Sequence, residues 1–424
     1  MKIIEGFELA KAALSRRTSA EFYDSALEPK VKQIIDDVRS RGDAALFDYT
    51  KKFDGVKLSS LEVSKKQVKN AYQQVDEEFV SALKLAAERI RSFHRKQKNN
   101  IWRSVKAGSG QLIRPLECVG AYAPGGTASY PSTVLMTAIP AKVAGVKEVI
   151  LATPPKADGA IPSPTLVAAD IAQVDRIFSV GGAQAIAALA FGTESIPKVD
   201  KICGPGNIFV VLAKKLVYGV VDIDGLYGPS EILIIADEAA SPAYCAADLL
   251  AQAEHDPLAS AILITTSKRL ADAVNQEVKQ QLKGLERQAI AAESLRKRGV
   301  IAVVAGVNEA IELANLYAPE HLSMMVKEAD AYVEQVANAG CIVIGESSTV
   351  VLGDYVFGPS HVLPTGATAR FSSPLNILDF VKITSLVDVD KASLKQLGKA
   401  AAIMARAEGL EAHARAVEKR LGTD

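Results

Sequence analysis

The first hundred residues of the chain carry apolar side chains at helical spacing. Within residues 65–98, four of them fall on one stripe: Val80, Leu83, Ala87 and Ile90. This spacing is typical of an amphipathic helix that packs on one side. Residues 6–100 are therefore predicted to be mostly helical. His94 lies in the basic tail of this region, and we expect it to be a solvated helix residue.

From about residue 112 the pattern changes to short apolar runs, each followed by a turn and a helical segment. Six runs of this kind begin at residues 119, 149, 176, 232, 261 and 299. Strands that alternate with helices indicate parallel α/β packing, and two sheet-based domains are the simplest account. After Asp390 the pattern is again helical, with Gly398 and Gly409 as possible breaks.

The length of 424 residues favours two or three domains. Lys and Arg number 49, as do Asp and Glu, so the formal net charge is zero. A neutral chain lacks the electrostatic signature of a nucleic-acid or acidic-membrane partner, which favours a small-molecule partner. No apolar run reaches the roughly 18 residues of a membrane span, and no secretory signal is recognisable. We therefore predict a cytoplasmic protein, and reduced thiols at its four widely spaced cysteines.

Four of the five histidines fall between residues 255 and 413, each beside a carboxylate, an amide or a turn. Histidine titrates near neutral pH and is a common metal ligand. Any single histidine is more often a satisfied structural residue, so the argument depends on the whole set. The set predicts a metal site and an acid/base pair.

The metal prediction begins with Gln252 and His255, which are three residues apart and share a face near a helix end that Pro257 enforces. An amide oxygen and an imidazole, joined by Asp354 in a glycine-punctuated loop and His413 in the C-terminal helix, make a mixed N/O set that suits zinc. By spacing alone, hydrogen bonds from Gln252 and His255 to loop carbonyls at the helix end would explain these two residues about as well as metal binding does.

Glu320 and His321 follow a proline turn and are adjacent acid and base side chains. Such a pair can serve one reaction centre, one group taking a hydroxyl proton and the other activating water. The alternative is an ordinary helix start in which the glutamate favours the helix dipole.

A standard dinucleotide fingerprint is excluded, because no GxGxxG stands between a strand and a helix. Gly181-Gly182 and Gly204-Pro-Gly206-Asn207 nevertheless precede predicted helices, where free N–H groups attract phosphate. Glycine turns before helices often only shape the chain, so each motif alone is weak evidence.

The chain resembles the histidinol dehydrogenase family from about residue 20 to about residue 420. Eight segments carry the likeness, in this order: Tyr122-Ala-Pro-Gly-Gly, Val180-Gly-Gly-Ala-Gln-Ala-Ile, Gly204-Pro-Gly-Asn, Gly228-Pro-Ser-Glu, Gln252-Ala-Glu-His-Asp-Pro, Tyr317-Ala-Pro-Glu-His, Gly353-Asp-Tyr and His361-Val-Leu-Pro-Thr-Gly. The resemblance implies an α/β fold of two incomplete Rossmann-like domains, one inserted in the other, with small helical segments at both termini. Its expected parts are a helical segment at 1–22, a first α/β domain at 23–121 and 236–374, an inserted NAD-binding domain at 122–235, and a helical dimerisation segment at 375–424.

The resemblance also implies a function: the zinc-dependent, four-electron oxidation of L-histidinol to L-histidine by way of L-histidinal, with two NAD reduced in turn. The positions that match the family's NAD contacts are Tyr122, Gln184 and Asn207. Those that match its zinc ligands are Gln252, His255, Asp354 and His413, the last from the partner subunit of a homodimer. Glu320 and His321 match the acid/base pair. The substrate is expected to contact Ser230, His361 and Glu408, together with the four zinc ligands and His321.

Two residues depart from the expected pattern: Tyr227 before Gly228-Pro-Ser, and Ser360 before His361. Because of these two differences, a dehydrogenase of another amino or sulfonated alcohol is an alternative. Tyr227 is expected at the pocket rim near Ser230. A zinc hydrolase using Glu320 and a catalytically silent nucleotide-binding protein are further alternatives. A nucleophilic Cys203 would be a competing route for aldehyde oxidation, but its apolar setting predicts burial.

Overall fold

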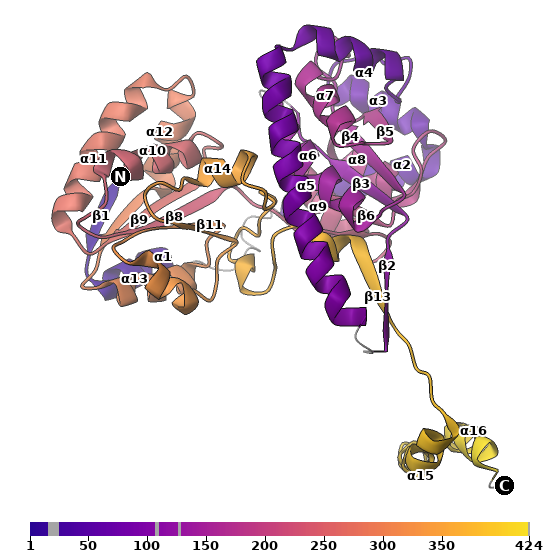
Figure 1. Cartoon of the computed structure of the whole chain (residues 1–424). Helices are drawn as coiled ribbons and strands as arrows, with labels where there is room; N and C mark the ends of the chain where they lie inside the picture. The colour runs from indigo at the N-terminus through magenta and orange to yellow at the C-terminus, as the bar shows by residue number, and fades with distance from the viewer. Residues whose placement is uncertain (16–24, 107–109, 126–128, 423–424) are drawn as a thin grey trace. The chain divides into compact units, whose positions relative to one another are not determined.

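The computed structural model describes residues 1–15, 25–106, 110–125 and 129–422 (Figure 1). These residues form two compact units, one made of residues 1–98 and 115–381 and the other of residues 99–114 and 382–424. In the described ranges, no helix is long and apolar enough to cross a membrane.

One sheet of the first unit contains, among the described residues, six parallel strands in the order β1-β10-β9-β8-β11-β12. Their bounds are β1 Lys2–Glu5, β8 Glu231–Ala236, β9 Ser260–Thr265, β10 Val300–Val303, β11 His321–Met325 and β12 Cys341–Ile344. Alternate residues of a strand point to opposite faces. Ile232 and Ile234 accordingly join one core, and Leu233 and Ile235 the other.

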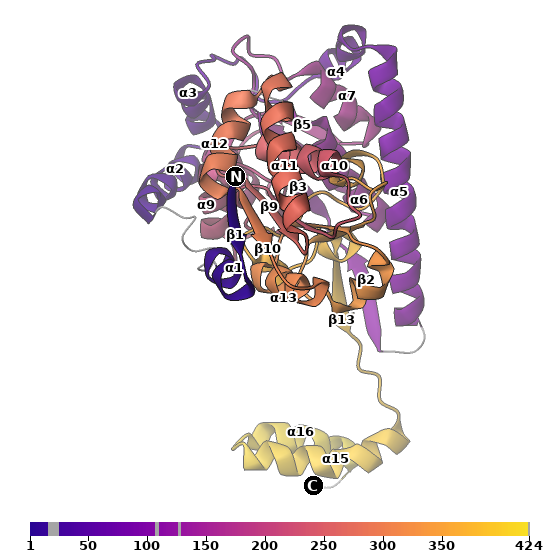
Figure 2. The same ribbon diagram turned by 90° about the vertical axis from the view of Figure 1, so that its left-hand side faces the viewer.

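Helices cover both faces of this six-stranded sheet (Figure 2). One face packs against α10 Pro242–Ala253, α11 Lys268–Gln281 and α12 Gln288–Arg298. The other packs against α1 Phe7–Leu14 and α13 Val307–Tyr317. Because both faces are buried, the strands read in the sequence as continuous apolar runs.

The second sheet of this unit contains, among the described residues, five parallel strands in the order β5-β4-β3-β6-β7. Its elements are β3 Cys118–Tyr122, β4 Glu148–Thr153, β5 Arg176–Ser179, β6 Lys201–Cys203 and β7 Asp222–Ile223, with helices α6 Pro131–Ala144, α7 Ser163–Ile171, α8 Gly182–Phe191 and α9 Ile208–Val217. All of these lie between β1 and β8 in the chain. The predicted α/β fold, with one sheet domain inserted in the other, is therefore confirmed.

The boundaries of the parts differ from those predicted. Residues 1–22 were expected to be helical, but β1 pairs with β10 before α1 begins, and residues 16–22 lie outside the described ranges. Strand β3 starts at Cys118, four residues before the predicted insertion. The segment 375–424 holds a strand, β13 Val381–Ser385, as well as helices.

The segment before the insertion also packs differently from the prediction. Helices α2 Glu28–Arg41 and α3 Asp43–Phe53 bury Val31, Ile34 and Leu46 in the core of the five-stranded sheet, together with Ile186 of α8. These helices were predicted to belong to the first domain with the six-stranded sheet. The shorter elements nearby are α4 Lys65–Ala71 and the 3-10 turns η2 Ser25–Leu27 and η3 Tyr72–Gln74.

His94 lies in the long helix α5, Glu77–Lys106. The prediction that it is exposed to solvent is wrong. His94 lies one turn beyond Ile90 and continues the buried stripe, with 0% of its surface exposed. Its Nδ1 is 3.2 Å from Gln97 Oε1, whereas Nε2 is buried without a partner in the described part of the chain. Burial lowers the pKa of His94 to about 4.

We expect His94 to destabilise the fold in acid. An imidazole in the unfolded chain has a pKa of about 6.5. Because the folded pKa is lower, the unfolded state binds the extra proton first, and the free energy of unfolding falls as pH decreases from about 6.5 to about 4. The loss amounts to at most about 3 kcal/mol. In urea unfolding, the stability advantage of wild type over His94→Asn should shrink across this range, and a constant difference would contradict the prediction.

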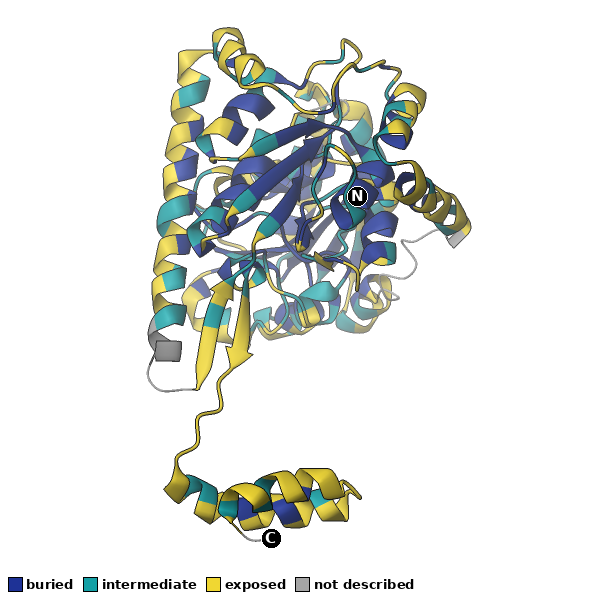
Figure 3. Cartoon of the chain, turned by 90° about the vertical axis from the view of Figure 1, so that its right-hand side faces the viewer, coloured by how far each residue is buried: buried dark blue, intermediate teal, exposed yellow. Residues whose placement is uncertain are grey.

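The second unit pairs β13 with β2, Gln111–Pro115, and contains the helices α15 Lys391–Ala407 and α16 Glu411–Leu421. The predicted break at Gly409 is confirmed, and its φ of 76° is one that glycine adopts without strain. The predicted break at Gly398 is wrong, because α15 continues through it. A Cβ at Gly398 would lie 2.9 Å from Leu421 Cδ1. Glycine therefore allows α15 and α16 to approach closely. Both helices are largely exposed, as the yellow colour in Figure 3 shows.

The remaining described elements of the first unit are short. They are η4 Leu282–Gly284, η5 Ala329–Gln335, α14 Val350–Tyr355, η6 Thr368–Arg370 and η7 Ile377–Phe380. All four cysteines lie in the described ranges and are free thiols, Cys203 and Cys245 buried and Cys118 and Cys341 partly buried.

Candidate active site

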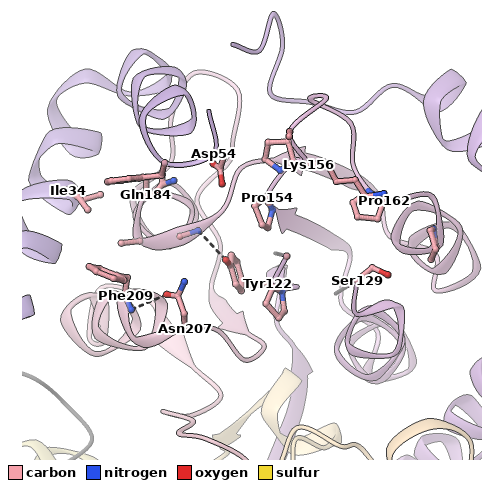
Figure 4. Close-up of a pocket in the computed structure, with 18 residues that line it drawn as sticks. Ile34, Asp54, Tyr122, Ser129, Pro154, Lys156, Pro162, Gln184, Asn207 and Phe209 are labelled. Atoms are coloured by element: carbon pink, nitrogen blue, oxygen red, sulfur yellow. Dashed lines mark hydrogen bonds between the residues drawn. The ribbon is translucent and has the colours of Figure 1, made fainter. Parts of the chain in front are cut away.

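A cavity of about 780 Å³ lies at the carboxyl ends of the five-stranded sheet and is lined by the three predicted NAD contacts, Tyr122, Gln184 and Asn207 (Figure 4). The strand order reverses between β3 and β6, and Tyr122 ends the first of these strands. Such a switch point is where open α/β sheets bind ligands. The volume falls within the range of about 300–1,000 Å³ that is usual for small-molecule and cofactor sites.

Tyr122 is fixed in the cavity by helix α8. Its hydroxyl accepts a hydrogen bond from the N–H of Gly182, the first residue of that helix, at 3.1 Å. Gly182 has φ of 66°, and a Cβ there would lie 2.8 Å from Gln184 Oε1. Burial raises the pKa of Tyr122 to about 12, so the hydroxyl stays protonated. It can therefore donate to an oxygen of a bound ligand.

Asn207 is the N-cap of α9, and its Oδ1 accepts from the N–H groups of Phe209 and Val210 at 3.0 and 3.2 Å. The turn before it is held on both sides of Gly204: the N–H donates to Asp224 at 2.7 Å, and the carbonyl accepts from Lys214 at 3.0 Å. Lys214 and Asp224 also form a buried ion pair. The glycine turn is thus rigidly placed at the cavity. Gly126, the last residue of the Tyr122-Ala-Pro-Gly-Gly segment, lies outside the described residues.

A second group of functional side chains gathers around His321. Glu320 and His321 are 7% and 4% exposed, and His321 begins strand β11, so the alternative of an ordinary helix start is excluded. His321 Nε2 is 3.2 Å from Asp354 Oδ1, and Nδ1 is 3.6 Å from Glu320 Oε2. Burial opposes protonation of His321, but the two carboxylates outweigh it and hold its pKa well above the usual value.

Asp354 lies in the short helix α14 and not in a loop as predicted. Burial opposes its ionisation, but His321 outweighs this effect and, with the charges of His361 and His255, keeps the pKa of Asp354 below its usual value. The Asp354 carbonyl is 2.8 Å from His361 Nδ1. The ionised carboxylate of Asp354 therefore interacts electrostatically with three imidazoles, those of His321, His361 and His255.

Helix α6 connects the cavity with this group of side chains. Ser129, just before the helix, lines the cavity, and the Thr133 hydroxyl in its first turn is 3.3 Å from His361 Nε2. The segment from Ser129 to Thr133 thus reaches from the cavity lining to His361, whose other ring nitrogen contacts the Asp354 carbonyl.

The other predicted metal ligands are only partly brought together. Gln252 lies in the last turn of α10 and is buried. His255 was predicted to share its helix face, but α10 ends at Ala253, and His255 is exposed two residues beyond that end. His413 is exposed on α16, in the second unit. In the described ranges, no group of three or more His, Cys, Asp or Glu side chains is arranged to hold a metal. The donor types fit zinc all the same, since an imidazole and an ionised carboxylate are ordinary zinc ligands and the amide oxygen of Gln252 adds a neutral oxygen donor.

Comparison with known proteins identifies the family. The family model for histidinol dehydrogenase matches residues 17–421. The chain belongs to the histidinol dehydrogenase family. It is 59% identical to a histidinol dehydrogenase of Dehalococcoides mccartyi, over 99% of this chain and 100% of that one. It is 52% identical to one of Clostridium acetobutylicum, over 92% and 91%. The crystal structure of histidinol dehydrogenase from Elizabethkingia anophelis superposes with a TM-score of 0.93 at 36% identity, covering 100% of this chain and 98% of that one.

The predicted substrate contacts of this histidinol dehydrogenase family member are divided between the two units. Ser230 and His361 belong to the first unit, Ser230 at the start of β8 with its carbonyl accepting from Ser260 N–H at 2.9 Å. Glu408 is exposed at the end of α15 in the second unit. The predicted contacts therefore do not form one site within a described unit.

Tyr227 and Ser360 are the two residues that depart from the family pattern. The ring of Tyr227 lies over Lys214 Nζ, 4.9 Å from the centroid, beside the buried ion pair with Asp224. Ser360 is buried, and its hydroxyl accepts from Val362 N–H at 3.2 Å. Both residues thus have structural partners of their own.

Sequence reasoning missed Glu231, which holds the acid/base pair in place. Its N–H donates to Glu320 Oε2 at 2.7 Å, and its own Oε2 accepts from Glu320 N–H at 3.3 Å. Its carbonyl oxygen is 3.2 Å from His321 Nδ1, and Oε1 accepts from Gly366 N–H at 3.2 Å. The available signal was a glutamate directly before the apolar run of β8 in the quoted Gly228-Pro-Ser-Glu segment.

Proposed function

We propose that this protein oxidises L-histidinol to L-histidine by way of L-histidinal, with zinc as its metal and NAD as the hydride acceptor in both steps. The observation that carries the proposal is the connection, through α6, of a cofactor-sized cavity with the Glu320–His321–Asp354 group. Family membership supports a dehydrogenase acting on histidinol.

NAD is proposed to bind in the cavity. Tyr122 offers a hydroxyl donor, and Gln184 and Asn207 offer side-chain amides. The N-termini of α8 and α9 both lie at this cavity, and the positive ends of the two helix dipoles favour phosphate. The N–H groups of Gly182, Phe209 and Val210 are themselves bonded within the protein. These two turns replace the absent GxGxxG fingerprint.

Zinc is proposed to bind Gln252, His255, Asp354 and His413 of the partner subunit. When bound, it supplies a fixed positive centre that orients the imidazole and amine of the substrate. Ser230, His361 and Glu408 are proposed to complete the substrate contacts. They provide a hydroxyl, an imidazole and a carboxylate, which suit the polar groups of an amino alcohol.

In the first step, the neutral form of His321 is proposed to take the hydroxyl proton of histidinol as hydride leaves the carbinol carbon. A zinc ion bound to Asp354 would oppose the effect of the carboxylates that raises the pKa of this imidazole. The Glu231 carbonyl accepts the Nδ1 proton, so Nε2 is the nitrogen that exchanges protons with substrate. In the second step, water adds to the aldehyde, and Glu320 is proposed to take the water proton before the second hydride leaves. One Glu320 oxygen is fixed by Glu231 N–H, which leaves the other for water.

Cys203 is not proposed as a nucleophile. Its side chain is buried in β6, and burial raises the pKa of the thiol well above its usual value. A thiolate is the reactive form of cysteine, so this thiol is inert at neutral pH. The hydrate route through Glu320 is therefore favoured.

A homodimer with shared sites is also proposed. The second unit exposes large apolar side chains on and before its helices: Val387, Leu397, Ile403, Met404 and Leu410. The region around Asp354 does so as well, at Val351, Leu352, Tyr355 and Phe357. Exposed apolar groups that gather in this way mark association surfaces.

Removal of the metal tests the proposal. Prolonged chelation should abolish NADH formation from histidinol and NAD, and added zinc should restore it. Circular dichroism should change little, because the apolar cores of both sheets contain none of the proposed zinc ligands. Full activity in protein that elemental analysis shows to be free of divalent metal would eliminate the zinc site.

A further inference from the structure

Helix α10 carries a second polar side chain on the face of Gln252, a proposed zinc ligand. Asp248 and Gln252 are four residues apart within α10 and so share one side of the helix, and His255 follows two residues after the helix ends at Ala253. Asp248 is 6% exposed and Gln252 is 2% exposed. A buried carboxylate therefore lies one turn before Gln252, with no part in the proposed chemistry.

Asp248 is bonded to the helix that carries Asp354. The hydroxyl of Thr349 donates to Asp248 Oδ1 at 2.7 Å. Thr349 is the N-cap of α14, and the same hydroxyl accepts from Val351 N–H at 3.4 Å. One hydroxyl thus joins the first turn of α14 to the ligand face of α10, across 101 positions of the chain.

Fold stability does not explain this buried carboxylate. In the part of the chain that the structure describes, Asp248 Oδ2 is buried without a hydrogen-bond partner. Such a group destabilises the folded state, and an apolar side chain of similar size in its place is often neutral or stabilising. Burial also raises the pKa of Asp248, which reflects the same cost.

Helix α14 is short and is held at both ends. It has six residues, of which only Val350 is buried. Near its end, Asp354 contacts His321 through its side chain and His361 through its carbonyl. At its start, the hydrogen bond from Thr349 ties the helix to Asp248 of α10 and so constrains where Asp354 lies relative to Gln252.

We propose that Asp248 and Thr349 are a positioning pair that sets Asp354 against Gln252 and His255 for metal binding. This inference rests on the zinc site of the proposed function. Without the pair, α14 would have to be ordered when the metal binds. The free energy of ordering the helix would then weaken metal binding. Loss of an outer partner of this kind typically lowers metal affinity about 10- to 100-fold.

The test is the zinc dissociation constant of the full-length protein, measured by competition with a chelator of known affinity. Thr349→Val keeps the shape but removes the hydroxyl, and should weaken zinc binding about 10- to 100-fold. Thr349→Ser keeps the hydroxyl and should bind as wild type does. Asp248→Ala removes the other half of the bond and should match Thr349→Val.

Ser294→Ala is the matched control for general destabilisation. Ser294 is a fully buried hydroxyl of α12 that donates to the Ala259 carbonyl at 2.9 Å and touches none of the proposed ligands. Its loss should lower the free energy of unfolding and leave zinc affinity unchanged. If Ser294→Ala weakened zinc binding as much as Thr349→Val, the positioning role would be overturned.

Gln252→Ala separates this inference from the proposed function. If it weakens zinc binding while Thr349→Val and Asp248→Ala bind as wild type does, the zinc site stands and the positioning pair is wrong. If wild type binds no stoichiometric zinc, or Gln252→Ala has no effect, the ligand set fails and the inference fails with it.

Discussion

Glu320→Gln should slow oxidation of histidinal about 10²- to 10⁴-fold, the usual contribution of a general base, while oxidation of histidinol falls by less than about tenfold. Only the second step needs activated water. The glutamine oxygen can still accept from Glu231 N–H, which in wild type donates to Glu320 at 2.7 Å, so the side chain keeps its place and loses only its basicity. The two half-reactions are measured separately, by supplying histidinol or histidinal with NAD.

Two variants control this result. Glu238→Gln makes the same chemical change at an exposed position and should affect neither step. His321→Asn should instead damage the first step, because it removes the acceptor of the hydroxyl proton. Equal impairment of both half-reactions by Glu320→Gln would count against the role assigned to Glu320.

Mixed dimers of two inactive variants should recover about a quarter of wild-type activity. Gln252→Ala and His413→Ala each remove one proposed zinc ligand, so both homodimers should be nearly inactive. When the two are unfolded and refolded together, about half of the dimers are mixed. If His413 serves the partner's site, each mixed dimer has one intact site and one doubly damaged site.

His413 and Gln252 lie in different units of the chain, so the mixed dimers decide which chain supplies His413 to the proposed site. Native mass spectrometry would confirm that mixed dimers are present. If they are present and activity is not recovered, His413 acts within its own chain or has no part in the site.

Sequence patterns predicted the elements that have long or repeated signals. The six apolar runs all became strands, because parallel strands buried on both faces are apolar throughout. The glycine turns at Gly181 and Gly206 precede α8 and α9, as predicted. These features depend on neighbours in sequence, so a local pattern is sufficient to find them.

Features set by distant contacts could not be predicted in this way. Strand β1 has four residues, too few to show a period, and it is a strand because β10 pairs with it. Helices α2 and α3 are amphipathic, but nothing in their pattern says which sheet their apolar face covers. His94 belongs to the buried stripe of α5, but its neighbours in the sequence are mostly charged, and the local pattern therefore predicted a solvent-exposed side chain.

The site shows the same division between local and distant information. The resemblance drew attention to Glu320 and His321, and the structure places Asp354 beside them. Glu231 and Asp248 act through bonds to residues 89 and 101 positions away, which local spacing does not reveal. The joining of His413 to the other ligands depends on a second subunit and stays a prediction.

The ratio of NADH formed to L-histidinol consumed tests the central claim most directly. With excess NAD and no added aldehyde, the account predicts two NADH for each histidinol and L-histidine as the product, because both hydrides leave the same carbon in turn. One NADH for each histidinol, with histidinal accumulating, would contradict the four-electron oxidation. No NADH at all from zinc-loaded protein would contradict the proposed function.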